Sequence, residues 1–108
     1  MDKQLSETVE RFRAALENAG IRPERGVLFG SRAVGTAHEH SDYDLAVVSG
    51  DFRGMNLLRR FEAIGAALAK AGVMEPVEAI PCTPEEFDAG QPGTLIADEI
   101  KARGVRVL

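Results

Sequence analysis

One segment, residues 27–48, constrains the fold of this chain more than any other. It reads VLFGSRAVGTAHEHSDYDLAVV: a short apolar run, a Gly-Ser pair, ten largely polar residues and an acidic triplet that leads into a second apolar run. Short runs rich in Val, Leu and Phe are typical of buried strands. The segment therefore predicts two strands, at Val27 to Phe29 and at residues 43–48, with a polar connection between them.

The facing ends of these two strands carry residues that suit a phosphate and a metal ion. The turn at Gly30 and Ser31 can direct backbone N–H groups and a hydroxyl at an anion, and a helix that starts there adds its positive dipole end. Asp42 and Asp44 are two residues apart on the second strand, so both carboxylates lie on one face with Cα atoms about 7 Å apart. Between them, the two strand ends can hold a triphosphate and its Mg²⁺.

The rest of the chain alternates between helical and strand patterns. Apolar residues recur at helical spacing in residues 5–19 and 57–71, and a glycine follows each stretch. In the second helix, the residues expected to pack on the sheet are Leu57, Leu58, Phe61, Ile64, Leu68 and Ala71. A third strand is expected at Val73–Ile80 and is closed by Pro81. Shorter elements are expected as helices at 31–37, 83–87 and within 94–103, and as a strand at 105–108. The pattern predicts an α/β (α+β) fold, a small mixed sheet of three to four strands flanked by helices.

Length and composition exclude several classes of protein. A chain of 108 residues can form one core, so a single domain over residues 1–108 is expected. The net charge is −4 and neither half of the chain is basic, which disfavours direct nucleic-acid binding. Cys82 is the single cysteine, so no intrachain disulfide is expected. No apolar stretch has the length of a signal peptide or a membrane span, and a cytoplasmic protein is therefore expected.

The segment at 27–48 resembles the signature of the DNA polymerase beta-like nucleotidyltransferase superfamily. That signature is an apolar run, Gly-Ser, a spacer near ten residues and then acidic-hydrophobic-acidic, and the closest likeness within it is to the minimal nucleotidyltransferases (MNT). The matching residues are Gly30, Ser31, the spacer from Arg32 to Ser41, Asp42 and Asp44. Other nucleotide-binding signatures are missing from the sequence, because neither GxxxxGK-S/T nor GxGxxG occurs.

The resemblance implies a third acidic residue on the strand after the second helix. That expected strand contains Glu78 between Val77 and Ala79, and we assign the role to Glu78. Asp is commoner at this position in the family. Glu75 is the competing candidate, although it precedes Pro76 at the edge of the strand, where a solvated side chain is the simpler interpretation.

The resemblance also implies an activity, in which a nucleoside triphosphate, expected to be ATP, binds beside two Mg²⁺ ions. An acceptor hydroxyl attacks the α-phosphorus with help from Glu78, and pyrophosphate leaves. The implied site residues are Gly30, Ser31 and Arg32 for the nucleotide, and Asp42, Asp44 and Glu78 for metal binding and catalysis. Arg32 can equally be an ordinary surface arginine.

Three functions remain open for such a domain. The first is transfer of AMP to a partner protein, expected to be a helical HEPN-domain protein in a toxin–antitoxin pair. The second is a binding module, an inactive antitoxin that covers the same partner. Three clustered carboxylates favour the enzyme, because their repulsion lowers stability without metal. The third is transfer to a small-molecule hydroxyl, for which the chain lacks an acceptor domain unless a homodimer forms the pocket.

Overall fold

The structure is a computed structural model that describes residues 3–30, 43–89 and 104–108. Its elements, in chain order, are α1 (Lys3–Asn18), β1 (Arg25–Phe29), β2 (Tyr43–Val48), the 3₁₀ helix η1 (Gly50–Phe52), α3 (Leu57–Ala71), β3 (Val77–Cys82), α4 (Pro84–Ala89) and β4 (Val105–Arg106). The helices expected at 31–37 and within 94–103 lie outside the described residues. The expected mixed α+β architecture is confirmed.

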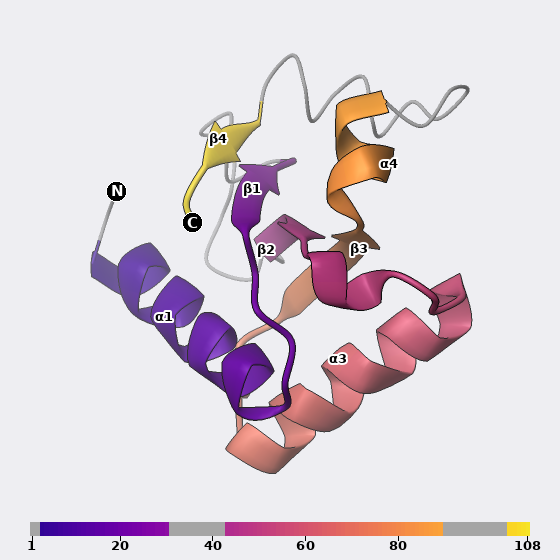
Figure 1. The fold of residues 1–108 in the computed structure, drawn as a ribbon. Coiled ribbons are helices and arrows are strands. Elements are labelled where there is room, and N and C mark those ends of the chain that lie inside the picture. The colour runs from indigo at the N-terminus through magenta and orange to yellow at the C-terminus, as the bar shows by residue number, and fades with distance from the viewer. Residues whose placement is uncertain (1–2, 31–42, 90–103) are drawn as a thin grey trace.

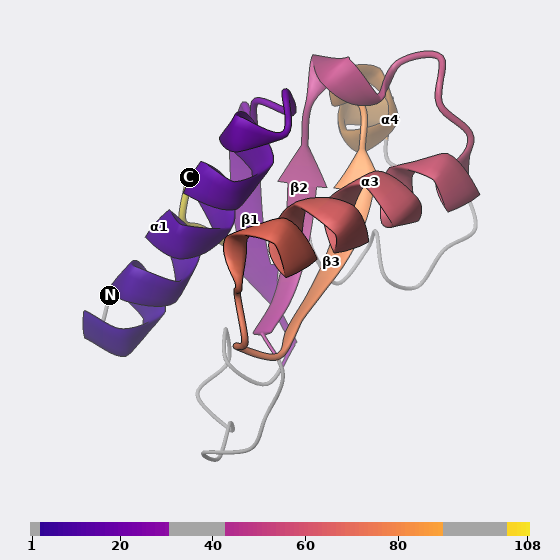
Figure 2. The same ribbon diagram turned by 90° about the horizontal axis from the view of Figure 1, so that it is seen from below.

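The four strands form one sheet in the order β3-β2-β1-β4. Strand β1 is antiparallel to β2 and β4, whereas β2 and β3 are parallel and are connected by α3, as a parallel pair requires a crossover. Helices α1 and α3 cover one face of the sheet, and α4 stands on the other side, beyond the end of β3 (Figures 1 and 2). None of the helices in the described ranges is long and apolar enough to span a membrane.

The two faces of the sheet have separate cores. On the helix face, Leu28, Leu45 and Val47 of the sheet pack with side chains of α1 and α3 in the larger cluster. By strand alternation and register, the opposite face is made of Val27, Phe29, Asp44, Ala46, Glu78 and Ile80, and we call it the carboxylate face. Its apolar members form a second, smaller cluster, to which α4 contributes Phe87.

Helix α1 and strand β2 lie where the sequence predicts them. Phe12 and Leu16 are fully buried along one side of α1, and burying a side chain of this size contributes about 1.5–3 kcal/mol. Strand β2 spans residues 43–48, as expected. The expected bounds of the third strand, 73–80, are wrong: β3 spans 77–82 and therefore includes Pro81.

Pro81 is tolerated inside β3 because of the direction in which its backbone points. The N–H of Tyr43 donates to the carbonyl of Pro76, and the N–H of Ser49 donates to the carbonyl of Cys82. The backbone N–H and C=O groups of the even-numbered residues of β3 therefore point toward β2, and those of residue 81 point away from it. Since β3 is at the edge of the sheet, a residue without an N–H loses no ladder hydrogen bond there.

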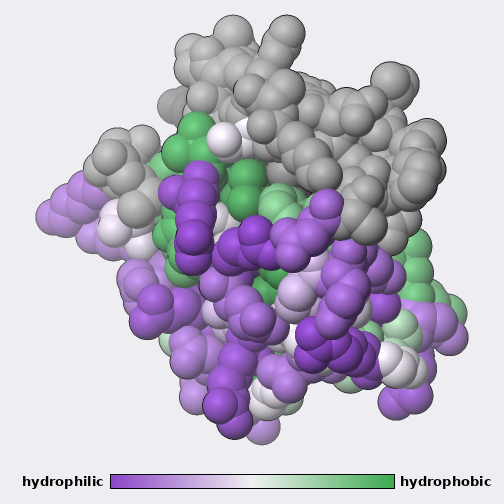
Figure 3. Space-filling model, turned by 45° about the horizontal axis from the view of Figure 1, so that its top comes forward, coloured by the Kyte–Doolittle hydropathy of each residue, from purple (hydrophilic) through white to green (hydrophobic). Residues whose placement is uncertain are grey.

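Helix α3 has the expected bounds but a different buried side. Ile64 is buried as expected, whereas Leu57, Leu58 and Phe61 are 57%, 66% and 43% exposed. The expectation that Leu57, Leu58 and Phe61 pack on the sheet is wrong, because Arg60, only 9% exposed, takes the inward position. Ala71, at the end of the helix, is also exposed and not buried as expected. Apolar surface is visible at the right-hand edge of Figure 3, the side on which α3 begins in Figure 1.

Capping residues set the ends of α3 and α4. The side chain of Asn56 accepts a hydrogen bond from the N–H of Arg59 at 2.9 Å, and Gly72 terminates α3 in the left-handed conformation. At the start of α4, the hydroxyl of Thr83 accepts from the N–H of Glu86 at 3.2 Å, while Oε1 of Glu86 accepts from the N–H of Thr83 at 2.8 Å. This reciprocal capping box fixes the turn between β3 and α4.

Candidate functional site

Two of the predicted acidic residues are neighbours on the carboxylate face. Asp44 of β2 lies directly opposite Glu78 in the parallel register with β3, and directly opposite Phe29 in the antiparallel register with β1. Register partners point to the same face and neighbouring strands are about 4.8 Å apart, so the two carboxylates extend side by side. Asp44 is half-buried and Glu78 is exposed. A ligand can therefore reach the pair from the Glu78 side.

Gly30 directly follows β1 and lies against Asp44. Its φ is 73°, in the left-handed region that residues with a side chain rarely adopt. A Cβ added to Gly30 would overlap Oδ2 of Asp44. Both the backbone conformation and the close approach therefore require glycine, and the predicted phosphate-binding turn begins beside a predicted metal ligand.

The competing candidate, Glu75, is engaged elsewhere. It precedes β3 and forms an ion pair with Arg11 of α1. The pKa of the Glu75 carboxyl is lowered, first by a hydrogen bond from its own backbone N–H and then by Arg11. Glu75 thus connects the loop before β3 to α1, whereas Glu78 lies beside Asp44.

The other predicted site residues, Ser31, Arg32 and Asp42, lie outside the described residues. Within the part of the chain that the structure describes, no group of three His, Cys, Asp or Glu side chains forms a potential metal site. Asp44 and Glu78 nevertheless present adjacent carboxylates, the ligands that Mg²⁺ prefers in proteins. Asp42 is the third donor that the sequence predicts for this pair.

Two further side chains near the site are accounted for by packing. Tyr43 is 4% exposed within the core of the helix face, as its place in the alternation predicts. Cys82 is half-buried, and its pKa is raised, first by burial and then by the negative charge of Glu86. Little of such a thiol is present as the reactive thiolate at neutral pH, which agrees with a packing role for Cys82.

The contacts of α4 are the part of this region that the sequence does not reveal. Within the described residues, three ion pairs join α4 to other elements: Arg53–Glu85, Arg60–Glu86 and Arg25–Asp88. The partners are 32, 26 and 63 residues apart, so no local spacing rule connects them. The sequence does contain a local signal, the Thr-x-x-Glu capping pattern at the start of α4. This pattern predicts where the helix begins but not which residues contact it.

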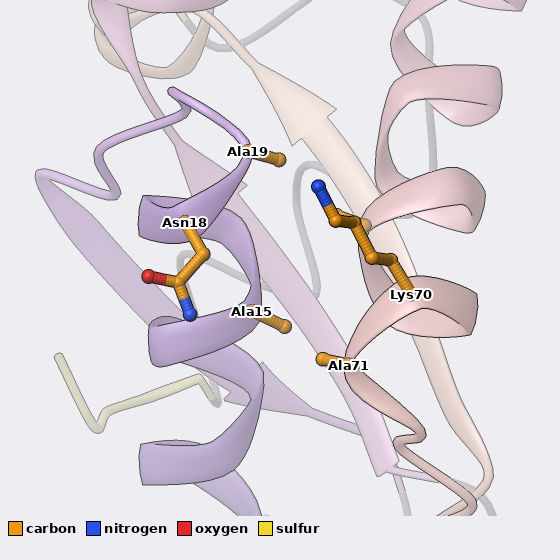
Figure 4. Close-up of a pocket in the computed structure, with 6 residues that line it drawn as sticks. Ala15, Asn18, Ala19, Lys70 and Ala71 are labelled. Atoms are coloured by element: carbon orange, nitrogen blue, oxygen red, sulfur yellow. The ribbon is translucent and has the colours of Figure 1, made fainter.

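A pocket of about 340 Å³ lies between α1 and α3, on the opposite side of the sheet from Asp44 and Glu78. Figure 4 shows Lys70 of α3 extending along the space between the two helices. The lining residues are Ala15, Asn18, Ala19, Ala67, Lys70 and Ala71. The pocket contains no carboxylate and is not part of the candidate site.

Comparison with known proteins agrees with this geometry. The sequence matches the family model of the nucleotidyltransferase domain over residues 7–107, and no curated protein matches it. Among solved structures, a protein from Sulfolobus solfataricus provisionally described as a nucleotidyltransferase has a TM-score of 0.61 and 22% identity, covering 96% of this chain and 76% of that chain. A toxin–antitoxin structure with AMP-PNP has a TM-score of 0.58 and 19% identity, covering 94% and 70% of the two chains. BolA1 from Arabidopsis thaliana has a TM-score of 0.52 and 21% identity, covering 73% and 94%.

The structural likenesses, all below 25% identity, show a shared fold. The family model goes further, because it spans nearly the whole chain, including Gly30, Asp44 and Glu78. The chain therefore belongs to the nucleotidyltransferase domain family.

Proposed function

We propose that this protein is a Mg²⁺-dependent nucleotidyltransferase that moves AMP from ATP to a hydroxyl of a partner protein. The observation that carries the proposal is the pairing of Asp44 and Glu78 on the carboxylate face, with Gly30 beside Asp44. Membership of the nucleotidyltransferase family supports the class of reaction. The similar toxin–antitoxin structure with AMP-PNP supports an adenine nucleotide and a partner protein.

Asp42, Asp44 and Glu78 are the residues that would hold two Mg²⁺ ions. Asp44 and Glu78 fit this role because hard carboxylate oxygens on adjacent strand positions suit a hard divalent cation. Bound Mg²⁺ supplies neutralisation of phosphate charge and lowers the pKa of a coordinated hydroxyl. Without a cation the two carboxylates repel each other, an arrangement that a purely structural domain does not need.

Gly30, Ser31 and Arg32 would bind the phosphates of the triphosphate. Gly30 leaves its backbone uncovered, so that phosphate can approach it closely, and Ser31 and Arg32 add a hydroxyl and a positive charge. Glu78, the exposed member of the acidic pair, accepts the proton of the acceptor hydroxyl. The hydroxyl oxygen attacks the α-phosphorus, a new phosphodiester bond forms and pyrophosphate leaves.

The test is a labelling experiment with the protein, Mg²⁺, each α-³²P nucleotide in turn and the product of the adjacent gene. We expect label from ATP to move onto the partner, and we expect Asp44→Asn and Glu78→Gln to abolish this transfer. Asp51→Asn and Glu62→Gln are matched controls, because both residues are exposed and lie outside the carboxylate face. Transfer that persists undiminished in Asp44→Asn would contradict the metal assignment.

The second candidate is an antitoxin that binds a HEPN-type partner without catalysis, and it is favoured by the likeness to a toxin–antitoxin structure. Under this alternative, the two proteins co-elute as a complex, no label moves with any nucleotide, and Asp44→Asn leaves the complex intact.

Transfer to a small molecule is the third alternative. Label that moves onto an added aminoglycoside, and not onto the partner protein, would identify it.

A further inference from the structure

Helix α4 is held by arginines from three separate parts of the chain. Its acidic residues pair with Arg53 of the segment after η1, with Arg60 of α3 and with Arg25 of β1. Arg60 reaches α4 from the other side of the sheet, because α3 covers the helix face whereas α4 stands on the opposite side (Figure 2). The arrangement connects the two sides of the sheet around its β3 edge.

The three ion pairs differ in how exposed their side chains are. The side chains of Arg25 and Asp88 are 30% and 66% exposed. The side chains of Arg53 and Glu85 are 57% and 64% exposed, and such surface pairs contribute little. The side chains of Arg60 and Glu86 are 11% and 32% exposed. Arg60 donates from Nη1 to Oε1 of Glu86 at 2.6 Å and from Nη2 to Oε2 at 3.3 Å, a bidentate arrangement. The Arg60–Glu86 pair therefore fixes α4 most strongly.

Both members of this pair are also held by other groups. Nε of Arg60 donates to the carbonyl of Met55 at 3.0 Å, and its guanidinium lies 6.0 Å from the centre of the Phe52 ring. The Oε1 atom of Glu86 that binds Arg60 also accepts the N–H of Thr83 in the capping box. One carboxylate thus determines both where α4 begins and where it lies.

The position of α4 matters for the carboxylate face. Phe87 packs against the apolar cluster of that face, which includes Phe29, the register partner of Asp44. Phe87 has a second contact, with the guanidinium of Arg25, which lies 4.8 Å from the centre of the Phe87 ring. Helix α4 therefore stands on the same face of the sheet as Asp44 and Glu78. It lies beside the strand ends at Val48 and Cys82, whereas Asp44 and Glu78 lie near the strand starts.

We infer that Arg60 is a positioning residue for nucleotidyl transfer. By holding Glu86 around the edge of β3, it fixes α4 and the Phe87 ring as a wall at the far end of the carboxylate face, toward which a nucleotide bound at Asp44 and Glu78 would extend. The inference rests on the proposed function, because only a nucleotide bound at the proposed metal ligands would extend along this face to the wall. In the described part of the chain, the hydrogen bonds of Arg60 go to Met55, Pro81 and Glu86, and none goes to Asp44 or Glu78. Loss of the pair therefore loosens nucleotide binding and leaves the chemical step in place.

The position of α4 can be measured separately from activity. The chain contains no tryptophan, so Phe87→Trp introduces a single reporter on α4. In this background, Glu86→Ala is expected to shift the emission to longer wavelength and to increase acrylamide quenching, while far-UV circular dichroism stays unchanged. Glu86→Gln, which keeps the capping box and an acceptor for Arg60, is expected to give a smaller shift. Glu85→Ala is the matched control and is expected to leave the emission unchanged.

Kinetics with ATP and Mg²⁺ test the role as a wall. Glu86→Ala is expected to raise KM for ATP roughly tenfold, the effect of one lost contact of about 1.4 kcal/mol, with kcat changed far less. Emission that is the same in Glu86→Ala and Glu85→Ala would overturn the positioning of α4. A shifted emission with unchanged KM would overturn the wall. Loss of the circular dichroism signal in both Glu86 variants would show that the pair stabilises the whole domain and would also overturn the inference.

The two proposals fail in different ways. A protein that binds no ATP and transfers no label contradicts the proposed function and, with it, the role of α4 as a nucleotide wall. The reporter emission still decides whether the Arg60–Glu86 pair positions α4, because that measurement needs no substrate.

Discussion

Replacing Gly30 with alanine is expected to destabilise the domain through two separate effects. The first is backbone strain, because φ is 73° at Gly30 and an L-residue in the left-handed region costs about 1–2 kcal/mol. The second is the overlap of the new Cβ with Oδ2 of Asp44. Gly54 separates the two effects, since its φ is 80° but an added Cβ would meet no atom within 4 Å.

The structure allows the two magnitudes to be estimated. Gly54→Ala should cost only the backbone term, about 1–2 kcal/mol. Gly30→Ala adds the displacement of a half-buried carboxylate, and such overpacking typically costs about 1–3 kcal/mol. We therefore expect a loss of about 2–5 kcal/mol for Gly30→Ala. In a domain of this size, each kcal/mol lowers Tm by roughly 4–8 °C.

Urea unfolding followed by far-UV circular dichroism measures both variants. A third protein, Gly30→Ala in an Asp44→Ala background, isolates the overlap, because the colliding carboxylate is gone. Relative to Asp44→Ala alone, this change should cost no more than Gly54→Ala does. If Gly30→Ala were no more destabilising than Gly54→Ala in the native background, the close approach of Gly30 to Asp44 would be refuted.

Three other predictions concern charge and ionisation. Asp44→Asn should abolish nucleotidyl transfer and, in EDTA, leave the free energy of unfolding equal or slightly higher, because it removes repulsion with Glu78; a marked loss of stability in urea would contradict this. The pKa of Glu86 is lowered below 4.5, and the hydrogen bond from Arg60 is the largest cause. The stabilisation from this pair is therefore complete above about pH 4.5, the pKa of the unfolded state, and is lost as the pH falls through the lower pKa of the folded state. The emission of the Phe87→Trp reporter should therefore shift only in acid, and a shift near neutral pH would be inconsistent with this pairing. Because burial raises the pKa of Cys82 above 9.0, its thiol should react with disulfide reagents at neutral pH more slowly than free cysteine and reach the free rate in urea; equal rates in the native protein would disprove the protection.

The elements that local pattern specifies were predictable from the sequence. Strand β2 has the expected bounds because its apolar run is bordered by the acidic triplet and by Ser49-Gly50. The alternation within β3 also places Glu78 on one face and Val77 and Ala79 on the other. Alternation within one strand does not predict the register between two strands. It is this register that places Glu78 opposite Asp44.

The errors arise where a distant partner overrides a local pattern. Pro81 was expected to close the third strand, yet the position is compatible with β3 because its backbone faces away from β2. Leu57 and Phe61 fit a buried helical face, yet Arg60 lies inward because Glu86, 26 residues later, neutralises it. Neither fact is contained in a short window of sequence.

The outer side of β3 also determines how this protein can meet other chains. Pro81 offers no N–H and its carbonyl faces Nη1 of Arg60 at 3.5 Å, while the N–H of Val77 donates to the carbonyl of Glu75. Within β3, only Ala79 keeps an N–H pointing outward without a recorded acceptor in the described residues. A neighbouring molecule thus finds no continuous row of backbone N–H donors along β3, which disfavours templated aggregation along this border. Recognition of β3 by another chain therefore depends more on its side chains than on strand pairing.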